Sequence, residues 1–142
     1  MKRIAAIALF VAATFITAGS ALAQDHQVKA TVPFNFTVNG SWLPAGNYTI
    51  GSGSIGTNVL SIADREKKVH ILAMGLTDSN YRGNSSKLVF HKYGDQYFLS
   101  EICYANSSTK VDFPTSKAEK RARTQAQEAA LRVNNDVMVA LN

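Results

Sequence analysis

Short stretches in which apolar and polar residues alternate, separated by turn residues, occupy residues 28–104 of the chain. Phe34, Phe36 and Val38 alternate with polar neighbours, which is typical of a strand buried on one face. The clearest hairpin spans residues 87–104, where two arms rich in Val, Phe, Tyr and Leu flank a Gly-Asp turn. A parallel pair of strands would need a helical crossover, and these stretches have no helical pattern between them. We therefore predict a mainly β fold, an antiparallel β-sandwich or small barrel of roughly six or seven strands.

Two turn signals divide the first part of this region. Asn39-Gly40 is the strongest short hairpin signal in the chain, because both residues tolerate the positive φ that a tight turn requires. Pro44-Ala45-Gly46 marks a second turn a few residues later. Trp42 lies between the two turns, so we expect its ring near the surface.

The pattern changes to a helical one after the β-rich region. Ser116 and Glu119 have the spacing of a capping box, in which each side chain bonds to the backbone N–H of the other residue at a helix start. The helix is predicted to run to about Val133, with a stripe of alanines against the sheet. Residues 137–141 fit either a last strand or a frayed tail. The predicted organisation is an antiparallel β domain at residues 24–114 and a helix and tail at residues 115–142, packed on that domain or appended to it.

The N-terminus has the order of segments that defines a secretory signal peptide. Two basic residues are followed by an apolar run at residues 4–16 and by a small-residue triplet that ends at Ala23. Cleavage is expected between Ala23 and Gln24, which removes residues 1–23. A transmembrane anchor is the alternative, but a span needs roughly 20 apolar residues and this run is shorter. We therefore predict an exported protein of the periplasm, outer surface or extracellular space, with no transmembrane helix after signal removal.

Charge and cysteine content narrow the range of partners. The chain has 15 basic and 10 acidic residues, for a net charge of +5. Removal of residues 1–23 takes away two basic residues and no acidic one, which leaves a net charge of +3. So modest a charge, without a dense basic patch, argues against nucleic acid as a partner. Cys103 is the single cysteine, so a buried apolar side chain and an intermolecular disulfide are both open for it.

Several motifs of the chain resemble those of a group of small, exported, uncharacterised β-rich proteins of soil bacteria. Members share a VPF-F-V stretch, here residues 32–38, and then an LPAG-Y stretch, here residues 43–48. A later hairpin at residues 90–99 and a P-S-A-E helix start at residues 114–119 also match. The resemblance covers most of the mature chain and implies a sandwich-like fold and export. The shared residues are turn prolines and glycines, core aromatics and a helix cap, so the resemblance implies no catalytic or binding residues.

The sequence contains no group of residues with the spacing of a catalytic or metal site. His26, His70 and His91 lack second ligands at a metal-binding spacing, and the serines lack the strand–turn–helix context of a nucleophile elbow. The glycine-rich residues 51–56 do not open the helix that a dinucleotide site requires. We therefore predict a non-enzymatic protein without metal or cofactor. The alternative is a small secreted hydrolase whose site the sequence does not reveal.

Exposed aromatic rings and a basic helix are the remaining candidates for binding. Trp42 lies beside a turn and Tyr81 in a loop, where the aromatic side chains of β-sandwiches can hold sugars or peptides; core or cross-strand packing is the alternative. The basic helix could contact an anionic surface or form an ordinary solvated face. We predict a binding or structural module of the cell envelope or extracellular space, with an envelope polymer, a glycan or another protein as partner. The candidate contacts to an anionic surface are Lys117, Lys120, Arg121 and Arg123.

Overall fold

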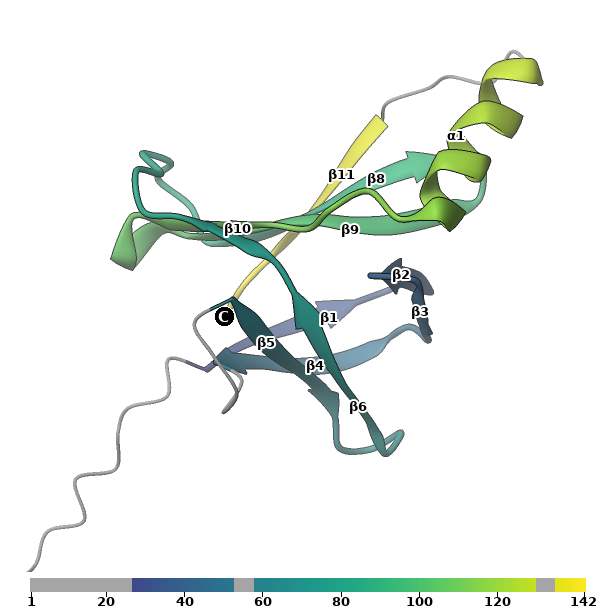
Figure 1. The fold of residues 1–142 in the computed structure, drawn as a ribbon. Coiled ribbons are helices and arrows are strands. Elements are labelled where there is room, and N and C mark those ends of the chain that lie inside the picture. The colour runs from purple at the N-terminus through teal and green to yellow at the C-terminus, as the bar shows by residue number, and fades with distance from the viewer. Residues whose placement is uncertain (1–26, 53–57, 130–134) are drawn as a thin grey trace, which may run out of the picture.

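The computed structural model describes residues 27–52, 58–129 and 135–142. In this part of the chain, eleven strands form two sheets, and one α-helix lies near the C-terminus. Figure 1 shows the two sheets one above the other, with the helix at one end of the upper sheet. The mainly β class and the C-terminal helix are thus confirmed. The predicted signal peptide, with its cleavage site at Ala23 and Gln24, lies outside the described residues.

The lower sheet in Figure 1 has four antiparallel strands in the described part of the chain. In order across the sheet, they are β1 (Val28–Val32), β4 (Gly46–Ser52), β5 (Val59–Asp64) and β6 (Val69–Met74). Side chains alternate between the core and the outside along each strand, as along β5, where Leu60 and Ile62 are buried and Ser61 is half-buried. The period of two in the sequence therefore reports which face of this sheet meets the core.

The upper sheet contains the other seven strands of the described chain. Its main path has the order β11 (Asn135–Ala140), β8 (Lys87–Tyr93), β9 (Gln96–Tyr104), β10 (Thr109–Asp112) and β7 (Leu76–Asp78), and a 3₁₀ turn, η1 (Ala105–Ser107), joins β9 to β10. A short hairpin of β2 (Phe36–Val38) and β3 (Ser41–Leu43) is attached to β9. The attachment is a parallel pairing of Thr37 with Phe98, whereas the other pairings among the described strands are antiparallel.

The predicted number of strands is wrong, and one of the two predicted architectures, the barrel, is excluded. The described chain has eleven strands rather than six or seven, and its two sheets do not close into a barrel. Strands β2, β3 and β7 have three residues each, too few for an alternation to be recognised. Strands β6 and β7 also look like a single strand in the sequence. Exposed and buried residues continue to alternate through Gly75, although the chain passes there from one sheet to the other. The parallel contact at Thr37 was not expected, but a hairpin docked by its side needs no crossover helix.

The two sheets share one hydrophobic core. Phe36 meets Tyr48 and Phe90 in edge-to-face geometry, with ring centroids 5.2 and 5.3 Å apart. A fully buried side chain of this kind contributes about 1.5–3 kcal/mol, so the rings and the aliphatic residues around them hold the sheets together. The largest buried aliphatic side chains come from both sheets and include Leu43, Ile50, Ile62, Leu88 and Ile102.

The helix α1 (Lys117–Glu128) begins where the capping box predicts. Ser116 Oγ accepts a hydrogen bond from the backbone N–H of Glu119 at 3.1 Å. The helix ends at Glu128, earlier than the predicted end near Val133, and residues 130–134 lie outside the described part of the chain. The start of the helix is therefore fixed by a local signal that its end lacks.

Small side chains on one face of α1 allow the helix to lie close to the upper sheet. Ala122 and Ala126 pack against Tyr93 of β8 and Phe98 of β9. These rings point away from the core between the sheets, so α1 covers the outer face of the β8–β9 hairpin. The predicted packing role of the alanine stripe is confirmed for these two residues.

The C-terminal tail is a strand rather than a frayed end. Strand β11 pairs with β8 along its whole length, and Val137 and Val139 pack against the core. Beyond it, Asn142 and Lys29 of β1 exchange two backbone hydrogen bonds, at 2.9 and 3.1 Å. The C-terminus therefore connects an edge of the upper sheet to an edge of the lower one.

Candidate functional site

Trp42 of β3 is the most exposed aromatic residue in the described part of the chain, with 65% of its surface accessible. It borders a cavity of about 250 Å³ between the β2–β3 hairpin and the turn that joins β8 to β9. We call this cavity the Trp42 groove. Its lining residues are Asn35, Phe36, Thr37, Trp42, Asp95, Gln96 and Tyr97.

The β2–β3 turn determines the direction in which Trp42 points. Asn39 and Gly40 have φ angles of +48° and +84°, as a tight two-residue turn requires, which confirms the turn predicted from the sequence. The hairpin pairs Thr37 with Trp42. Because Phe36 and Val38 beside Thr37 and Leu43 beside Trp42 are buried in the core, Thr37 and Trp42 lie on the outward face.

A second aromatic ring of the groove, that of Tyr97, is held in place by its neighbours. Phe34 stacks on it with a centroid distance of 4.0 Å and an interplanar angle of 17°. Lys92 Nζ lies 5.4 Å from the centroid of the same ring, which is a cation–π geometry. Tyr97 is therefore positioned before any ligand arrives, and a preorganised ring lowers the entropic cost of binding.

Carboxylate and amide groups accompany the two rings. Asp95 contributes a carboxylate to the groove, and Asn35 and Gln96 contribute amides. Asn35 Oδ1 accepts a hydrogen bond from the backbone N–H of Ala45 at 2.9 Å, which orients its amide. Aromatic faces pack against apolar surfaces, while carboxylates and amides exchange hydrogen bonds with hydroxyl groups. The groove can therefore hold a ring that is apolar on its face and carries hydroxyls on its rim.

Helix α1, which carries the predicted basic contact residues, packs on the β8–β9 hairpin, and this hairpin also borders the Trp42 groove. Helix α1 packs on Tyr93 and Phe98, and the groove uses residues 95–97 of the turn between these two rings. The helix and the β2–β3 hairpin accordingly lie at the same end of the molecule in Figure 1. Two sites that the sequence predicted separately thus both border the β8–β9 hairpin. The four predicted contact residues of the helix are all exposed: Lys117, Lys120, Arg121 and Arg123.

Tyr81 lies elsewhere, in the loop between β7 and β8. It is half-buried, and its backbone N–H donates a hydrogen bond to the carbonyl of Ser108 at 3.0 Å. A hydrogen bond with Cys103, followed by burial, raises the pKa of the Tyr81 hydroxyl. Cys103 is a buried residue of β9. This agrees with the first of the two interpretations that the sequence left open, a buried apolar side chain. The structure therefore does not bring Tyr81 into the Trp42 groove.

A histidine–carboxylate pair, which the sequence did not reveal, joins α1 to β8. Glu119 Oε1 lies 2.8 Å from His91 Nδ1, and the Glu119 side chain is only 7% exposed. Such a carboxylate orients a histidine, but no described serine, threonine or cysteine side chain is hydrogen-bonded to His91. The pair therefore attaches the helix to the sheet. Groups of three or more His, Cys, Asp or Glu suited to a metal ion do not occur among the described residues.

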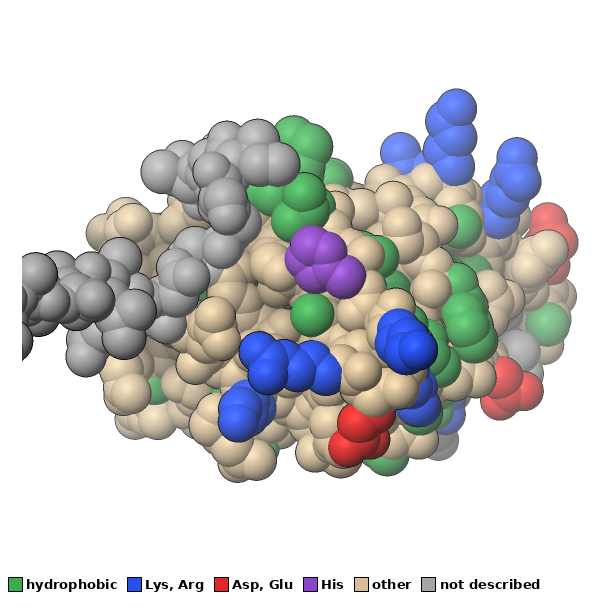
Figure 2. All heavy atoms as spheres, turned by 90° about the horizontal axis from the view of Figure 1, so that it is seen from below, with side chains coloured by type: hydrophobic (Ala, Val, Ile, Leu, Met, Phe, Trp, Pro, Cys, Tyr) green, Lys and Arg blue, Asp and Glu red, His purple; other side chains and the backbone are tan. Residues whose placement is uncertain are grey.

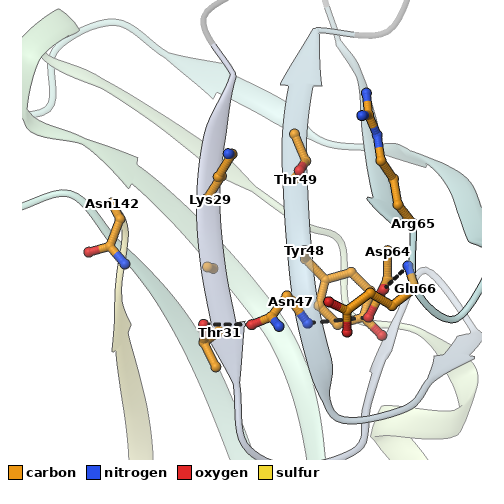
Figure 3. A pocket seen from close by; sticks show the side chains of 10 residues that line it. Lys29, Thr31, Asn47, Tyr48, Thr49, Asp64, Arg65, Glu66 and Asn142 are labelled. Atoms are coloured by element: carbon orange, nitrogen blue, oxygen red, sulfur yellow. Dashed lines mark hydrogen bonds between the residues drawn. The ribbon is translucent and has the colours of Figure 1, made fainter.

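A second cavity, of about 320 Å³, lies on the lower sheet beside the β5–β6 turn (Figure 3). The carboxylate of Asp64 is almost fully buried there. It accepts hydrogen bonds from the backbone N–H groups of Asn47, Glu66 and Lys67 at 2.9–3.2 Å. The most buried polar group of this cavity is thus already engaged in holding two turns together, and Tyr48, the aromatic residue of its lining, is buried. We call it the Asp64 cavity.

The Asp64 carboxylate also explains the LPAG-Y motif. A Cβ atom at Gly46 would collide with Asp64 Oδ2, so a glycine is required at this position. The hydroxyl of Tyr48 donates a hydrogen bond to the carbonyl of Pro44. Burial, reinforced by the charge of Asp64, raises the pKa of Tyr48 to about 12. The motif therefore stabilises a turn and contributes no exposed ring for a ligand.

Comparisons with known proteins do not identify the chain. No protein-family model, no curated protein and no solved structure matches the chain. In the described residues, no helix is both long and apolar enough to cross a membrane. A function must therefore be argued from the chemistry of the Trp42 groove.

Proposed function

We propose that the protein is an exported, non-enzymatic module that binds a glycan of the cell envelope or extracellular space in the Trp42 groove. The observation that carries the proposal is the 65% exposure of Trp42 beside a carboxylate, two amides and a second, fixed ring. Apolar surface left in water costs about 25 cal/mol per Å². A ligand that covers the indole removes this cost, and the gain contributes to its affinity.

The chemistry of the groove favours a sugar over other flat ligands. A pyranose has an apolar C–H face and a rim of hydroxyls that both donate and accept hydrogen bonds. The indole of Trp42 suits the face, whereas the Asp95 carboxylate and the Gln96 amide suit the rim. The cavity of about 250 Å³ is smaller than those that enclose drug-sized ligands. We therefore propose that it holds one or two units of a longer chain.

The basic helix adds an electrostatic contact to the proposal. The helix, whose basic residues are exposed, lies at the end of the molecule that carries the β2–β3 hairpin. An envelope polymer with phosphate or carboxylate groups can pass from the groove to the helix. Contacts between exposed charges are individually weak and are screened by salt. The helix should therefore increase retention at low ionic strength, while the groove determines which sugar is bound.

Binding is proposed in preference to hydrolysis because of the number of carboxylates. Glycoside hydrolysis generally uses a pair of carboxylates that flank the scissile bond, and Asp95 is the one acidic residue among those that line the groove. A small secreted hydrolase is the alternative. If the protein is such a hydrolase, soluble sugars should be released from the polysaccharides used as binding probes, and Asp95→Asn should abolish this release.

Export and the sandwich-like packing of the two sheets are parts of the same proposal. Fractionation of the host, with mass spectrometry of the N-terminus in each fraction, tests export. A chain that begins at Gln24 in the periplasm or outside the cell is the expected result. A chain that retains residues 1–23 in every fraction would contradict it.

Retention on polysaccharides tests the groove itself. Suitable probes are insoluble cellulose, chitin and peptidoglycan sacculi, with soluble polysaccharides in affinity electrophoresis. Trp42→Ala should weaken binding at least about 30-fold, which corresponds to roughly 2 kcal/mol for a central aromatic contact. Met138→Ala is the matched control, because Met138 on β11 is exposed to a similar extent, 60%, and does not line the groove. Equal binding by the wild type and Trp42→Ala would exclude the groove as the site.

A further inference from the structure

We propose that the Trp42 groove selects a sugar unit with a free, protonated amino group, and that Asp95 determines this preference. The inference rests on the proposed function, because it names the kind of sugar that the same site takes. Asp95 is the one charged residue among those that line the groove, and it is exposed in the turn between β8 and β9. A ligand that brings a positive charge into the groove therefore meets a carboxylate and no cation of the lining.

The carboxylate of Asp95 is not engaged in an ion pair within the fold. The ion pairs found among the described residues do not include it. Other carboxylates of the molecule are used internally: Asp64 accepts three backbone hydrogen bonds, and Asp112 lies 2.8 Å from Lys110 Nζ. An ammonium group of a ligand can therefore approach Asp95 without displacing an internal cation.

The aromatic rings of the groove also attract a cation. Lys92 Nζ lies 5.4 Å from the centroid of the Tyr97 ring, so one of these rings already takes an ammonium group within the fold. In the described part of the chain, no lysine or arginine lies over Trp42 in this way. Indole attracts a cation more strongly than the other aromatic side chains, and Trp42 is 65% exposed. Trp42 and Asp95 therefore both favour a positive charge bound in the cavity.

Lys92 limits the strength of this preference. It does not line the groove, but its charge lies beside Tyr97, which does, and it opposes a second cation there. An exposed ion pair and an exposed cation–π contact are each weak. From the two together, reduced by Lys92, we expect a preference of about tenfold for the aminated sugar.

The molecule as a whole does not attract a cationic sugar. The chain has a net charge of +5, or +3 without residues 1–23. Figure 2 shows lysine and arginine side chains across the underside of the molecule, with fewer acidic side chains among them. Long-range electrostatics therefore oppose the binding of an amine, and a preference for it has to arise in the groove. A polymer with both amino and anionic groups would place the former in the groove and the latter on α1.

Isothermal titration calorimetry with three β-1,4-linked tetrasaccharides tests the proposal. Those of glucosamine, N-acetylglucosamine and glucose share one backbone and differ in the group at C2, and only the first carries a charge. At about pH 6 such an amine is protonated. The wild type should bind the glucosamine tetrasaccharide about tenfold more tightly than either of the others. In Asp95→Asn, the affinities for the three should lie within about twofold of one another.

Asp78→Asn is the matched control, because it makes the same change of charge at an exposed aspartate that does not line the groove. Asparagine retains the acceptor for the backbone N–H of Asn80, which Asp78 Oδ1 accepts at 2.9 Å. This variant should keep the tenfold preference of the wild type, and circular dichroism should show the same fold in all variants.

The outcomes separate this inference from the proposed function. Equal affinity of the wild type for the three tetrasaccharides, or a preference that persists in Asp95→Asn, would overturn the inference. If binding were nevertheless lost in Trp42→Ala, the groove would remain a glycan site without this selectivity. If the wild type bound none of the tetrasaccharides and none of the polysaccharides, the inference and the proposed function would fail together.

Discussion

The Asp64 cavity and the Trp42 groove both lie beside β-hairpins in the described part of the chain, but they use their polar groups in opposite ways. In the Asp64 cavity, a carboxylate that is 1% exposed accepts three backbone hydrogen bonds and holds two turns together. In the Trp42 groove, the carboxylate of Asp95 is exposed and the indole is 65% exposed. The first cavity serves the fold, whereas the second presents apolar and polar groups to the solvent.

This contrast shows why shared motifs and function need not coincide. The LPAG-Y motif is explained by Asp64, because Gly46 makes room for its carboxylate. Trp42, immediately before this motif, is not needed by the core, since its ring faces away from it. A residue can therefore sit next to a structural motif and serve a different purpose. The contrast predicts that substitutions in the two cavities separate stability from binding.

Asp64→Ala should have the largest effect on stability. It leaves three partly buried backbone N–H groups without their acceptor, so we expect the free energy of unfolding to fall by about 3–5 kcal/mol. Urea denaturation measures this change. Asp64→Asn retains one acceptor oxygen and should lose clearly less. A loss below about 1 kcal/mol for Asp64→Ala would show that the carboxylate does not hold the turns.

Trp42→Ala should show the opposite behaviour. Because the ring is mostly exposed, the free energy of unfolding should change by no more than about 0.5 kcal/mol, while glycan binding weakens about 30-fold. Thermal unfolding and affinity electrophoresis of the same preparation provide the two values. A large loss of stability would place Trp42 among the structural residues and remove the contrast between the cavities.

High pH should lower the free energy of unfolding through the hydroxyl of Tyr48, which lies beside Asp64. Burial, with a smaller effect of the Asp64 charge, raises the pKa of Tyr48 from its ordinary value of 10.0 to about 12 in the folded chain. The unfolded chain therefore loses this proton first, and stability that is fully present below about pH 10 is lost as the pH approaches about 12. Urea unfolding at about pH 8 and about pH 11 measures the loss.

Tyr48→Phe is the control for this pH dependence. It removes the hydroxyl, so the difference in stability between the two pH values should be smaller than in the wild type. Part of the difference should persist, because burial also raises the pKa of Tyr104 to about 12. An identical pH dependence in wild type and variant would exclude Tyr48 as its cause.

The smallest expected effect concerns the cap of α1. Ser116→Ala removes the hydrogen bond that Ser116 Oγ accepts from Glu119 and should lower the free energy of unfolding by about 1 kcal/mol. Thr115→Ala is the matched control, since Thr115 is an adjacent exposed hydroxyl residue. Glycan binding should remain unchanged at moderate salt. Equal free energies of unfolding for Ser116→Ala and Thr115→Ala would mean that the cap hydrogen bond contributes little to stability.

Local signals in the sequence account for much of the fold. The alternation along β5, the tight turn at Asn39-Gly40 and the helix start at Ser116 each depend on residues within a few positions of one another, and all are found in the structure. The number of strands could not be derived in the same way. Three-residue strands such as β2 have no room for a periodic pattern, and the transfer of the chain between sheets at Gly75 leaves the alternation unbroken.

The candidate site was only partly accessible from the sequence. Trp42 could be singled out, because a large aromatic residue beside turn residues is a candidate for exposure. Its neighbours Asp95, Gln96 and Tyr97 could not, since they lie more than 50 positions away and reach it only when the two hairpins dock. The pairing of His91 with Glu119 was missed for the same reason. Contacts between distant elements leave no periodic trace in a single sequence.

Fluorescence of the single tryptophan tests the central claim most directly, because Trp42 is the only tryptophan of the chain and its ring borders the proposed site. The protein would be titrated with soluble oligosaccharides of glucose, xylose and N-acetylglucosamine. A sugar that stacks on the indole should shift its emission to shorter wavelengths in a saturable manner, with Trp42→Phe retaining part of the affinity. Retention on a polysaccharide without any change in the emission of Trp42 would contradict the account, because the glycan would then be bound elsewhere.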